Sequence, residues 1–146
     1  MARAKVGVQL SQQGTTIDEL RAAWRPADEL GVDSLWVWDH FFPLYGDPNA
    51  SHYEAYSLLG AMAVDTRHAQ FGVALAHGLP VIKARLAELR AAGRDRAEIE
   101  RTVAIRPDEV GSVDAYLDAG AQHVIVMMGP PYDLDPVRQP LEDGRA

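Results

Sequence analysis

Short apolar runs of strand length alternate with segments of helical periodicity, and this alternation restricts the fold more than any other feature of the sequence. The strand-like runs are residues 5–10, 34–39, 70–76, 102–105 and 123–128. The run at 34–39, Ser-Leu-Trp-Val-Trp-Asp, is apolar almost throughout, as is typical of a strand buried on both faces. Strands that alternate with helices of about 10 to 15 residues predict a parallel sheet with right-handed crossovers. The predicted fold class is therefore α/β.

Helix signals lie between these runs. Thr16 and Glu19 form a capping box, apolar residues then recur at three- and four-residue steps, and Gly31 marks the helix end. Pro26 interrupts this pattern and predicts either a bend or two shorter helices. Further helices are predicted at 53–64, from Pro80 to just before Gly93, and at 108–119, with a short helical piece after residue 129.

Two segments share one local pattern. Residues 30–37 and 119–126 both read as a helix end, a glycine, a short turn and an apolar strand. Such repetition indicates stacked strand–helix units. No linker or shift in composition divides the chain, so we expect residues 1–146 to form a single domain.

The length limits how many such units are present. A complete eightfold barrel of strands and helices takes about 250 residues, or about 31 for each unit, so 146 residues allow about five. By itself, this number is ordinary for a small α/β domain.

Composition excludes several classes of protein. The chain has no cysteine, which excludes a disulfide scaffold and a thiol nucleophile, and its net charge of −7 without a basic cluster argues against nucleic acid as a partner. The apolar runs are too short to span a membrane, and the start MARAKV lacks the apolar centre of a signal peptide. These features predict a cytoplasmic protein that is not bound to a membrane.

Candidate chemical groups lie just after the predicted strands, because ligands of parallel α/β folds bind beyond the carboxyl ends of the strands. The segments at this position are 11–14, 39–45, 74–78, 106–108 and 129–133. Asp39-His40 is the most informative pair, since a histidine beside a carboxylate and aromatic residues can act as a general acid or base. A simple turn-capping role for the pair is the alternative.

The remaining histidines are weaker candidates. His52, His68, His77 and His123 show no spacing typical of metal ligands, so no metal site is predicted. We expect His123, which begins a strand at the opposite end of the sheet, to be structural. Glu54 is placed to interact with the positive end of the second helix, and this role is favoured over catalysis.

The segment SLWVWDHFFP at residues 34–43, with ADELGVDS before it and HYEAYSLLGAMA after it, resembles the luciferase-like monooxygenase family. Within that family it is most similar to the branch that uses the deazaflavin coenzyme F420. The resemblance implies an eightfold-barrel ancestry, with Asp39 and His40 as the catalytic pair. It also implies that Asp39 and the end of the third strand (Val73, Ala74, Leu75 and Ala76) contact the cofactor.

The resemblance has a gap. After Ala76 the sequence passes directly into a helix that is similar to one near the carboxyl end of family members, so about three middle units, which carry the phosphate-binding segments, are absent. The resemblance therefore implies a truncated TIM-barrel-like (βα)5 arrangement of parallel strands. Five strands cannot close a barrel of the usual eight and would expose edge strands, so we expect the sheet to be completed by association of copies, with a homodimer favoured. Three hypotheses follow. The protein is an F420-dependent oxidoreductase that transfers hydride to or from an unknown small substrate, a non-catalytic truncated scaffold that binds or oligomerises, or an FMN-binding monooxygenase-like protein.

Overall fold

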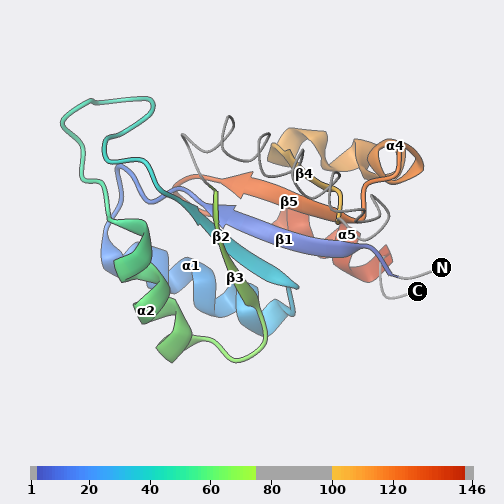
Figure 1. The fold of residues 1–146 in the computed structure, drawn as a ribbon, viewed down its shortest axis with the longest axis horizontal. Helices are drawn as coiled ribbons and strands as arrows, with labels where there is room; N and C mark the ends of the chain where they lie inside the picture. The colour runs from blue at the N-terminus through green and yellow to red at the C-terminus, as the bar shows by residue number, and fades with distance from the viewer. Residues whose placement is uncertain (1–2, 75–99, 144–146) are drawn as a thin grey trace, which may run out of the picture.

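The computed structural model describes residues 3–74 and 100–143, and its centre is one five-stranded sheet (Figure 1). All strand pairs in the sheet are parallel, and the strand order is β3-β2-β1-β5-β4. The strands are β1 (Lys5–Leu10), β2 (Ser34–Trp38), β3 (Gln70–Ala74), β4 (Thr102–Ile105) and β5 (His123–Met128). The predicted α/β class with five parallel strands is therefore confirmed.

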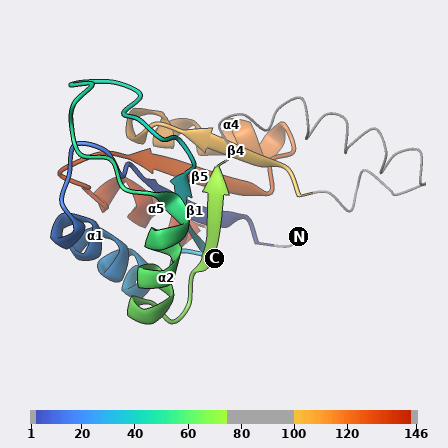
Figure 2. The ribbon, with the colours of Figure 1, turned by 60° about the vertical axis from the view of Figure 1, so that its left-hand side comes forward.

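Helices connect and flank the described strands. They are α1 (Ile17–Leu30), α2 (Ala55–Asp65), the 3-10 helix η2 (Pro107–Ser112), α4 (Val113–Asp118) and α5 (Asp135–Asp143). α1 and α2 lie at the half of the sheet that holds β2 and β3, whereas α4 and α5 lie at the half that holds β5 and β4 (Figures 1 and 2). None of these helices is long and apolar enough to cross a membrane.

The strand order fixes the direction in which the chain winds. The described connections between neighbouring strands run from β1 to β2, from β2 to β3 and from β4 to β5, and all three move in the same direction along the sheet. The last strand, β5, pairs with the first, β1. Because right-handed crossovers in one direction place their helices on one face, this is the winding of a barrel and not that of a doubly wound sheet. The predicted partial-barrel arrangement is therefore confirmed, with the interruption between β3 and β4.

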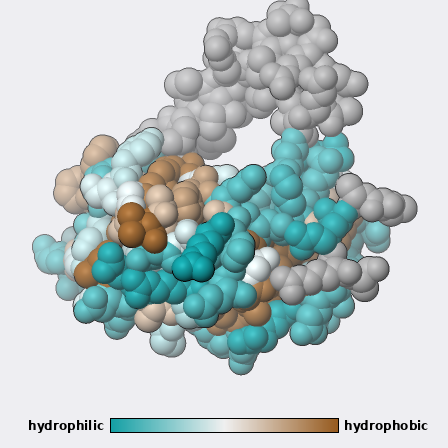
Figure 3. Space-filling model, turned by 90° about the horizontal axis from the view of Figure 1, so that it is seen from below, coloured by the Kyte–Doolittle hydropathy of each residue, from teal (hydrophilic) through white to brown (hydrophobic). Residues whose placement is uncertain are grey.

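The two faces of the sheet differ in chemistry. On the helix-covered face, alternate residues of β1, β2 and β5 are almost completely buried and apolar: Val6, Val8, Leu10, Leu35, Val37, Val124, Val126 and Met128. The opposite face carries polar and aromatic residues, among them Gln9, Ser34, Trp36 and His123. Seen from below, the described surface is mostly hydrophilic with separate apolar patches, as expected of amphipathic helices that bury one side only (Figure 3).

Helix α1 is continuous through Pro26, so the alternative of two shorter helices is wrong. Thr16 and Glu19 form the predicted capping box, and Gly31 ends the helix in the left-handed conformation at φ 87°. Proline removes one backbone hydrogen bond from a helix. Pro26 and Ala22, whose carbonyl loses that bond, are both exposed, so water can take the place of the missing donor.

Other predicted boundaries differ modestly from the structure. The second helix begins at Ala55 rather than at residue 53, because Glu54 caps it. The predicted helix at 108–119 is divided into η2 and α4, with Gly111, a poor helix former, near the junction. The helix predicted from Pro80 lies outside the described residues.

Asp28 of α1 fixes the turn that leads into β3. Its buried carboxylate accepts hydrogen bonds from the backbone N–H groups of Arg67 (2.9 Å), His68 (2.9 Å) and Ala69 (2.8 Å). Burial alone would raise the pKa of Asp28, but these hydrogen bonds outweigh it and lower the pKa below its usual value. The helix thereby sets where the edge strand β3 begins.

A buried polar chain joins the amino ends of the strands. His123 Nε2 lies 2.9 Å from Ser34 Oγ, which accepts a hydrogen bond from Trp36 Nε1 at 2.7 Å. His123 Nδ1 lies 3.1 Å from a carboxylate oxygen of Glu100. Since His123 and Ser34 are only 4% and 3% exposed, this arrangement holds strands together, which agrees with the structural role predicted for His123.

Gly7 leaves the space that the buried hydrogen-bonded side chains need, because it lies between Ser34 and His123 in the sheet. A Cβ atom at Gly7 would come within 2.3 Å of Ser34 Oγ and 2.9 Å of His123 Nε2. We predict that Gly7→Ala lowers the free energy of unfolding by on the order of 1–3 kcal/mol, as overpacking does elsewhere. Urea denaturation followed by circular dichroism measures the change.

Gly60→Ala is the matched control. Gly60 lies within α2, and an added Cβ meets nothing within 4 Å, so this variant should gain roughly 0.5–1 kcal/mol of stability. A Gly7→Ala protein as stable as the unsubstituted protein would show that the buried chain tolerates a methyl group.

Candidate functional site

A cavity of about 580 Å3 opens at the carboxyl ends of the strands, where the sequence predicts a ligand site. All five strands or the segments directly after them contribute to its wall. The lining residues are Gln9, Trp38, His40, Leu44, Tyr45, Ala74, Arg106, Pro107, Asp108, Met127, Met128 and Gly129. Four of the five segments singled out in the sequence meet here; from the fifth, residues 11–14, Ser11 supports the wall through its hydrogen bond with Tyr45.

The predicted site residues occupy different positions around this cavity. His40 and Ala74 line it directly. Asp39 lies beside it, lining a smaller neighbouring cavity together with His40, and its N–H donates to the Ala74 carbonyl at 3.2 Å. The Val73 side chain packs against the hydrophobic core, so Val73 could meet a ligand in the cavity only through its backbone. Leu75 and Ala76 lie outside the described residues.

Two aromatic rings, those of Trp38 and Tyr45, lie next to one another beside His40. The Trp38 and His40 rings meet edge to face, with centroids 6.2 Å apart and an interplanar angle of 82°. Tyr45 packs on Trp38 in the same manner, at 6.4 Å and 70°. The half-buried imidazole of His40 therefore contacts apolar ring surface and also lines the cavity.

The buried amide of Gln12 holds the end of β2 in place. Its Oε1 accepts the backbone N–H of Trp38 at 2.9 Å, and its Nε2 donates to the carbonyls of Trp38 at 2.7 Å and Tyr53 at 2.9 Å. The Gln12 side chain is fully buried. Three hydrogen bonds from one amide thus join the strand that leads to His40 to the segment that leads into α2.

The adjacent amide of Gln13 holds the intervening loop. Its Oε1 accepts the N–H of Leu44 at 2.7 Å, and its Nε2 donates to the Tyr45 carbonyl at 2.7 Å. The Tyr45 hydroxyl donates to Ser11 Oγ at 3.0 Å. Side chains that follow β1 therefore determine where the β2–α2 loop, and with it one wall of the cavity, lies.

A smaller cavity of about 150 Å3 lies on the other side of His40. It is lined by Asp39, His40, Phe41, His52, Glu54, Ala55 and Tyr56. Trp38 Nε1 donates to His52 Nε2 at 3.3 Å. Burial and the nearby His40 charge lower the pKa of His52, although a backbone hydrogen bond at Tyr53 acts in the opposite direction.

Glu54 has the capping role that the sequence favours. Its carboxylate accepts the backbone N–H groups of Tyr56 at 2.9 Å and Ser57 at 2.7 Å, at the start of α2. These hydrogen bonds lower the pKa of Glu54, so its charge is constant near neutral pH. It contributes a fixed negative charge to the smaller cavity.

Arg106 supplies a cation to the larger cavity. Its Nε lies 3.1 Å from a carboxylate oxygen of Asp108, and the hydrogen bond and charge of Asp108 raise the pKa of Arg106. The guanidinium is thus permanently charged, and the contact with Asp108 fixes its orientation. It can hold an anionic group of a ligand while the apolar walls hold the rest.

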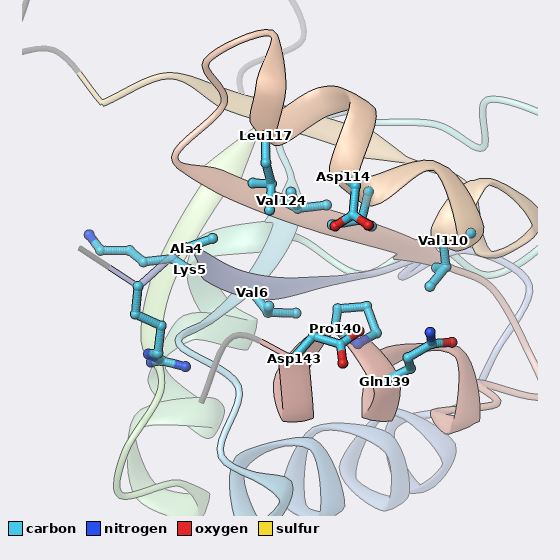
Figure 4. A pocket seen from close by; sticks show the side chains of 13 residues that line it. Ala4, Lys5, Val6, Val110, Asp114, Leu117, Val124, Gln139, Pro140 and Asp143 are labelled. Atoms are coloured by element: carbon cyan, nitrogen blue, oxygen red, sulfur yellow. The ribbon is translucent and has the colours of Figure 1, made fainter. Parts of the chain in front are cut away.

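Another cavity, of about 300 Å3, lies at the opposite end of the sheet between α4 and α5 (Figure 4). Leu117 and Val124 lie on one side and Pro140 on the other. Its two cationic residues, Arg3 and Lys5, are engaged with Asp33 and Glu100. Its described lining includes no histidine, and it lies away from the carboxyl ends, so it is the weaker candidate for chemistry.

Two features of the site were not identified in the sequence. The roles of Gln12 and His52 depend on contacts with residues 14 to 41 positions away. The available signal for Gln12 was a pair of consecutive amides, Gln12 and Gln13, separated from a buried strand by one residue. The described residues contain no group of three or more His, Cys, Asp or Glu side chains that could hold a metal ion.

These observations define a singly wound parallel α/β protein with a ligand-sized cavity beside a histidine at the carboxyl ends of its strands. The family model of the luciferase-like monooxygenases matches residues 1–92, which is more than half of the chain and includes Asp39, His40 and Ala74. The chain belongs to the luciferase-like monooxygenase family.

Two other comparisons complete the picture. No curated protein matches the chain. A solved structure of an F420-dependent secondary alcohol dehydrogenase in complex with an F420-acetone adduct is similar, with 23% identity and a TM-score of 0.44 over 72% of this chain. The chain spans 32% of the length of that enzyme.

We predict that Gln12→Leu destabilises the site selectively. Leucine fills a similar space but leaves the Trp38 and Tyr53 backbone groups without their partners, at a cost of about 1–3 kcal/mol for each buried group that water cannot reach. Chemical denaturation measures the stability, and the indole resonances report the displacement of Trp38. The exposed Gln139→Leu is the control and should change neither; equal effects of the two variants would contradict a specific role for the Gln12 amide.

Proposed function

We propose that the larger cavity binds the ring of a deazaflavin, coenzyme F420, and that the protein is an oxidoreductase acting on a small organic substrate. One observation carries the proposal: His40, an acid–base group, lines a cavity into which the carboxyl ends of all five strands converge. Family membership supports it. The likeness of SLWVWDHFFP to the deazaflavin branch favours F420 over FMN.

The residues present fit the ring of such a cofactor. A volume of about 580 Å3 lies within the roughly 300–1,000 Å3 typical of small-molecule sites. Trp38, Leu44 and Met127 give apolar walls, while Arg106 is a cation suited to an anionic group. When bound, the ring would supply the position that accepts or gives up a hydride.

The chain's own residues would divide the remaining tasks. His40, at the cavity wall, would hold or accept the proton that moves as the substrate is oxidised or reduced. Asp39, joined through its backbone to Ala74, would fix the ends of β2 and β3 relative to each other. Trp38 and Tyr45, which line the same cavity, would exclude water from the part of its wall beside His40.

Titration with F420 and, separately, with FMN tests the proposal through the fluorescence or absorbance of each compound. We expect saturable binding of F420 with a Kd of about tens of micromolar or lower. Ala74→Phe, which places a ring in the cavity, should weaken binding at least about tenfold, whereas Ala22→Phe on the exposed side of α1 should not. Saturation by FMN alone would favour the flavin alternative, and saturation by neither would leave a non-catalytic scaffold.

We also propose that the protein is a homodimer. Among the described strands, β3 pairs with β2 alone and β4 with β5 alone, so both edges of the sheet lack a second described neighbour. Unpaired edges favour association with another chain. Light scattering at micromolar concentration should give twice the chain mass of 16.0 kDa; a mass equal to one chain would refute the dimer without affecting the cofactor proposal.

A further inference from the structure

His52 and His40 line the same small cavity, which lies beside the larger one, but they face different partners. His40 contributes to the walls of both cavities, whereas His52 contributes to the smaller one. The two histidines are linked through Trp38, whose indole N–H points to His52 Nε2 at 3.3 Å and whose ring packs edge to face with His40. A single indole thus connects an acceptor on one side with the candidate acid–base group on the other.

We propose that neutral His52 is a positioning residue that holds Trp38 against His40, and that protonation of His52 releases Trp38 and opens the wall of the site. This inference rests on the proposed function for its effect on binding, but its structural part does not. His52 would act as a switch that keeps the site assembled near neutral pH and takes it apart in acid.

The hydrogen bond itself explains the switch. An indole nitrogen can only donate a hydrogen bond, so His52 Nε2 must carry no proton when it accepts from Trp38. The neutral ring then keeps its single proton on Nδ1. A second proton on Nε2 would set two N–H donors against each other at 3.3 Å, and the contact would be lost.

The surroundings of His52 favour its neutral form. The groups that face it across the smaller cavity are Asp39, His40, Glu54 and Tyr56. Burial and the charge of His40 lower the pKa of His52, and together they outweigh the backbone hydrogen bond at Tyr53, which acts in the opposite direction. Trp38 is therefore held above the lowered pKa of His52 and released below it.

The backbone near His52 is fixed independently, so the switch can move the indole without displacing the histidine. Residues Gln13 and His52 form an antiparallel bridge, and the Tyr53 carbonyl accepts from the Gln12 amide at 2.9 Å. The same amide holds both backbone groups of Trp38. What remains free to respond to protonation is the indole side chain.

Three substitutions separate the switch from a merely structural role. In His52→Gln the side-chain oxygen can accept from Trp38 at every pH, so the contact is kept and its pH dependence is lost. In His52→Leu the acceptor is lost at every pH. His68→Gln, which changes an exposed histidine before β3, is the control.

The indole N–H resonances in nitrogen-15 NMR spectra provide the readout. The chain has three tryptophans, and Trp38→Phe identifies the resonance that belongs to Trp38. In the unsubstituted protein and in His68→Gln, the Trp38 resonance should shift with a midpoint below the ordinary pKa of histidine. His52→Gln should remove this shift, and His40→Gln should raise the midpoint, because the neighbouring charge is gone.

A cofactor titration at several pH values gives the functional readout. F420 affinity should fall in acid for the unsubstituted protein but not for His52→Gln, and at neutral pH His52→Leu should bind up to about tenfold more weakly than His52→Gln. A Trp38 resonance that does not titrate, or that titrates equally in His52→Gln, overturns the proposal. If F420 binds at no pH while the resonance behaves as expected, the proposed function fails and the switch stands.

Discussion

The site depends on the buried amide of Gln12. Where a parallel strand ends, its last backbone groups lose their partners in the sheet, yet at β2 these groups are shielded from water. Gln12 supplies a donor and an acceptor to Trp38 and a second donor bond to Tyr53, so the loop between them begins and ends at positions set by one side chain. His40 and His52 both lie on that loop, and the Trp38 indole contacts both of them.

The winding of the chain explains why chemistry gathers at one end of the sheet. Because the described crossovers run in one direction, the helices cover one face with aliphatic side chains of β1, β2 and β5, and the opposite face carries aromatic and polar residues. At the amino ends these groups satisfy one another, as in the chain of Trp36, Ser34 and His123 that Gly7 permits. At the carboxyl ends, side chains of this face and of the segments after the strands line a cavity instead. The same face thus provides stability at one end and a site at the other.

The fold was more predictable than the site, and particular residues show why. The bounds of β1, β4, β5 and the capping box of α1 follow from local patterns, and the structure has them to the residue. The effect of Pro26 on α1 was harder to predict. A proline leaves one carbonyl of the helix without its donor, and whether that carbonyl reaches water depends on the tertiary structure. His40 could be found because it directly follows a buried strand. The role of Gln12 could not be found in the same way, since its amide bonds to backbone groups that are distant in the sequence and close only in the folded protein.

The cavity shows how a five-stranded sheet can still enclose a ligand-sized space. Two separate parts of the chain contribute to it. The matched amino-terminal segment brings Trp38, His40 and Ala74. In the second part, Arg106 follows β4 and Met127 is the penultimate residue of β5. They meet because β1 and β5 pair over six residues, so the first and last strands end at the same level. A ligand site at the mouth of such a sheet therefore requires the pairing of first and last strands more than it requires a closed barrel. His40 and Arg106 come from opposite sides of that pair, so the β1–β5 pairing determines their separation.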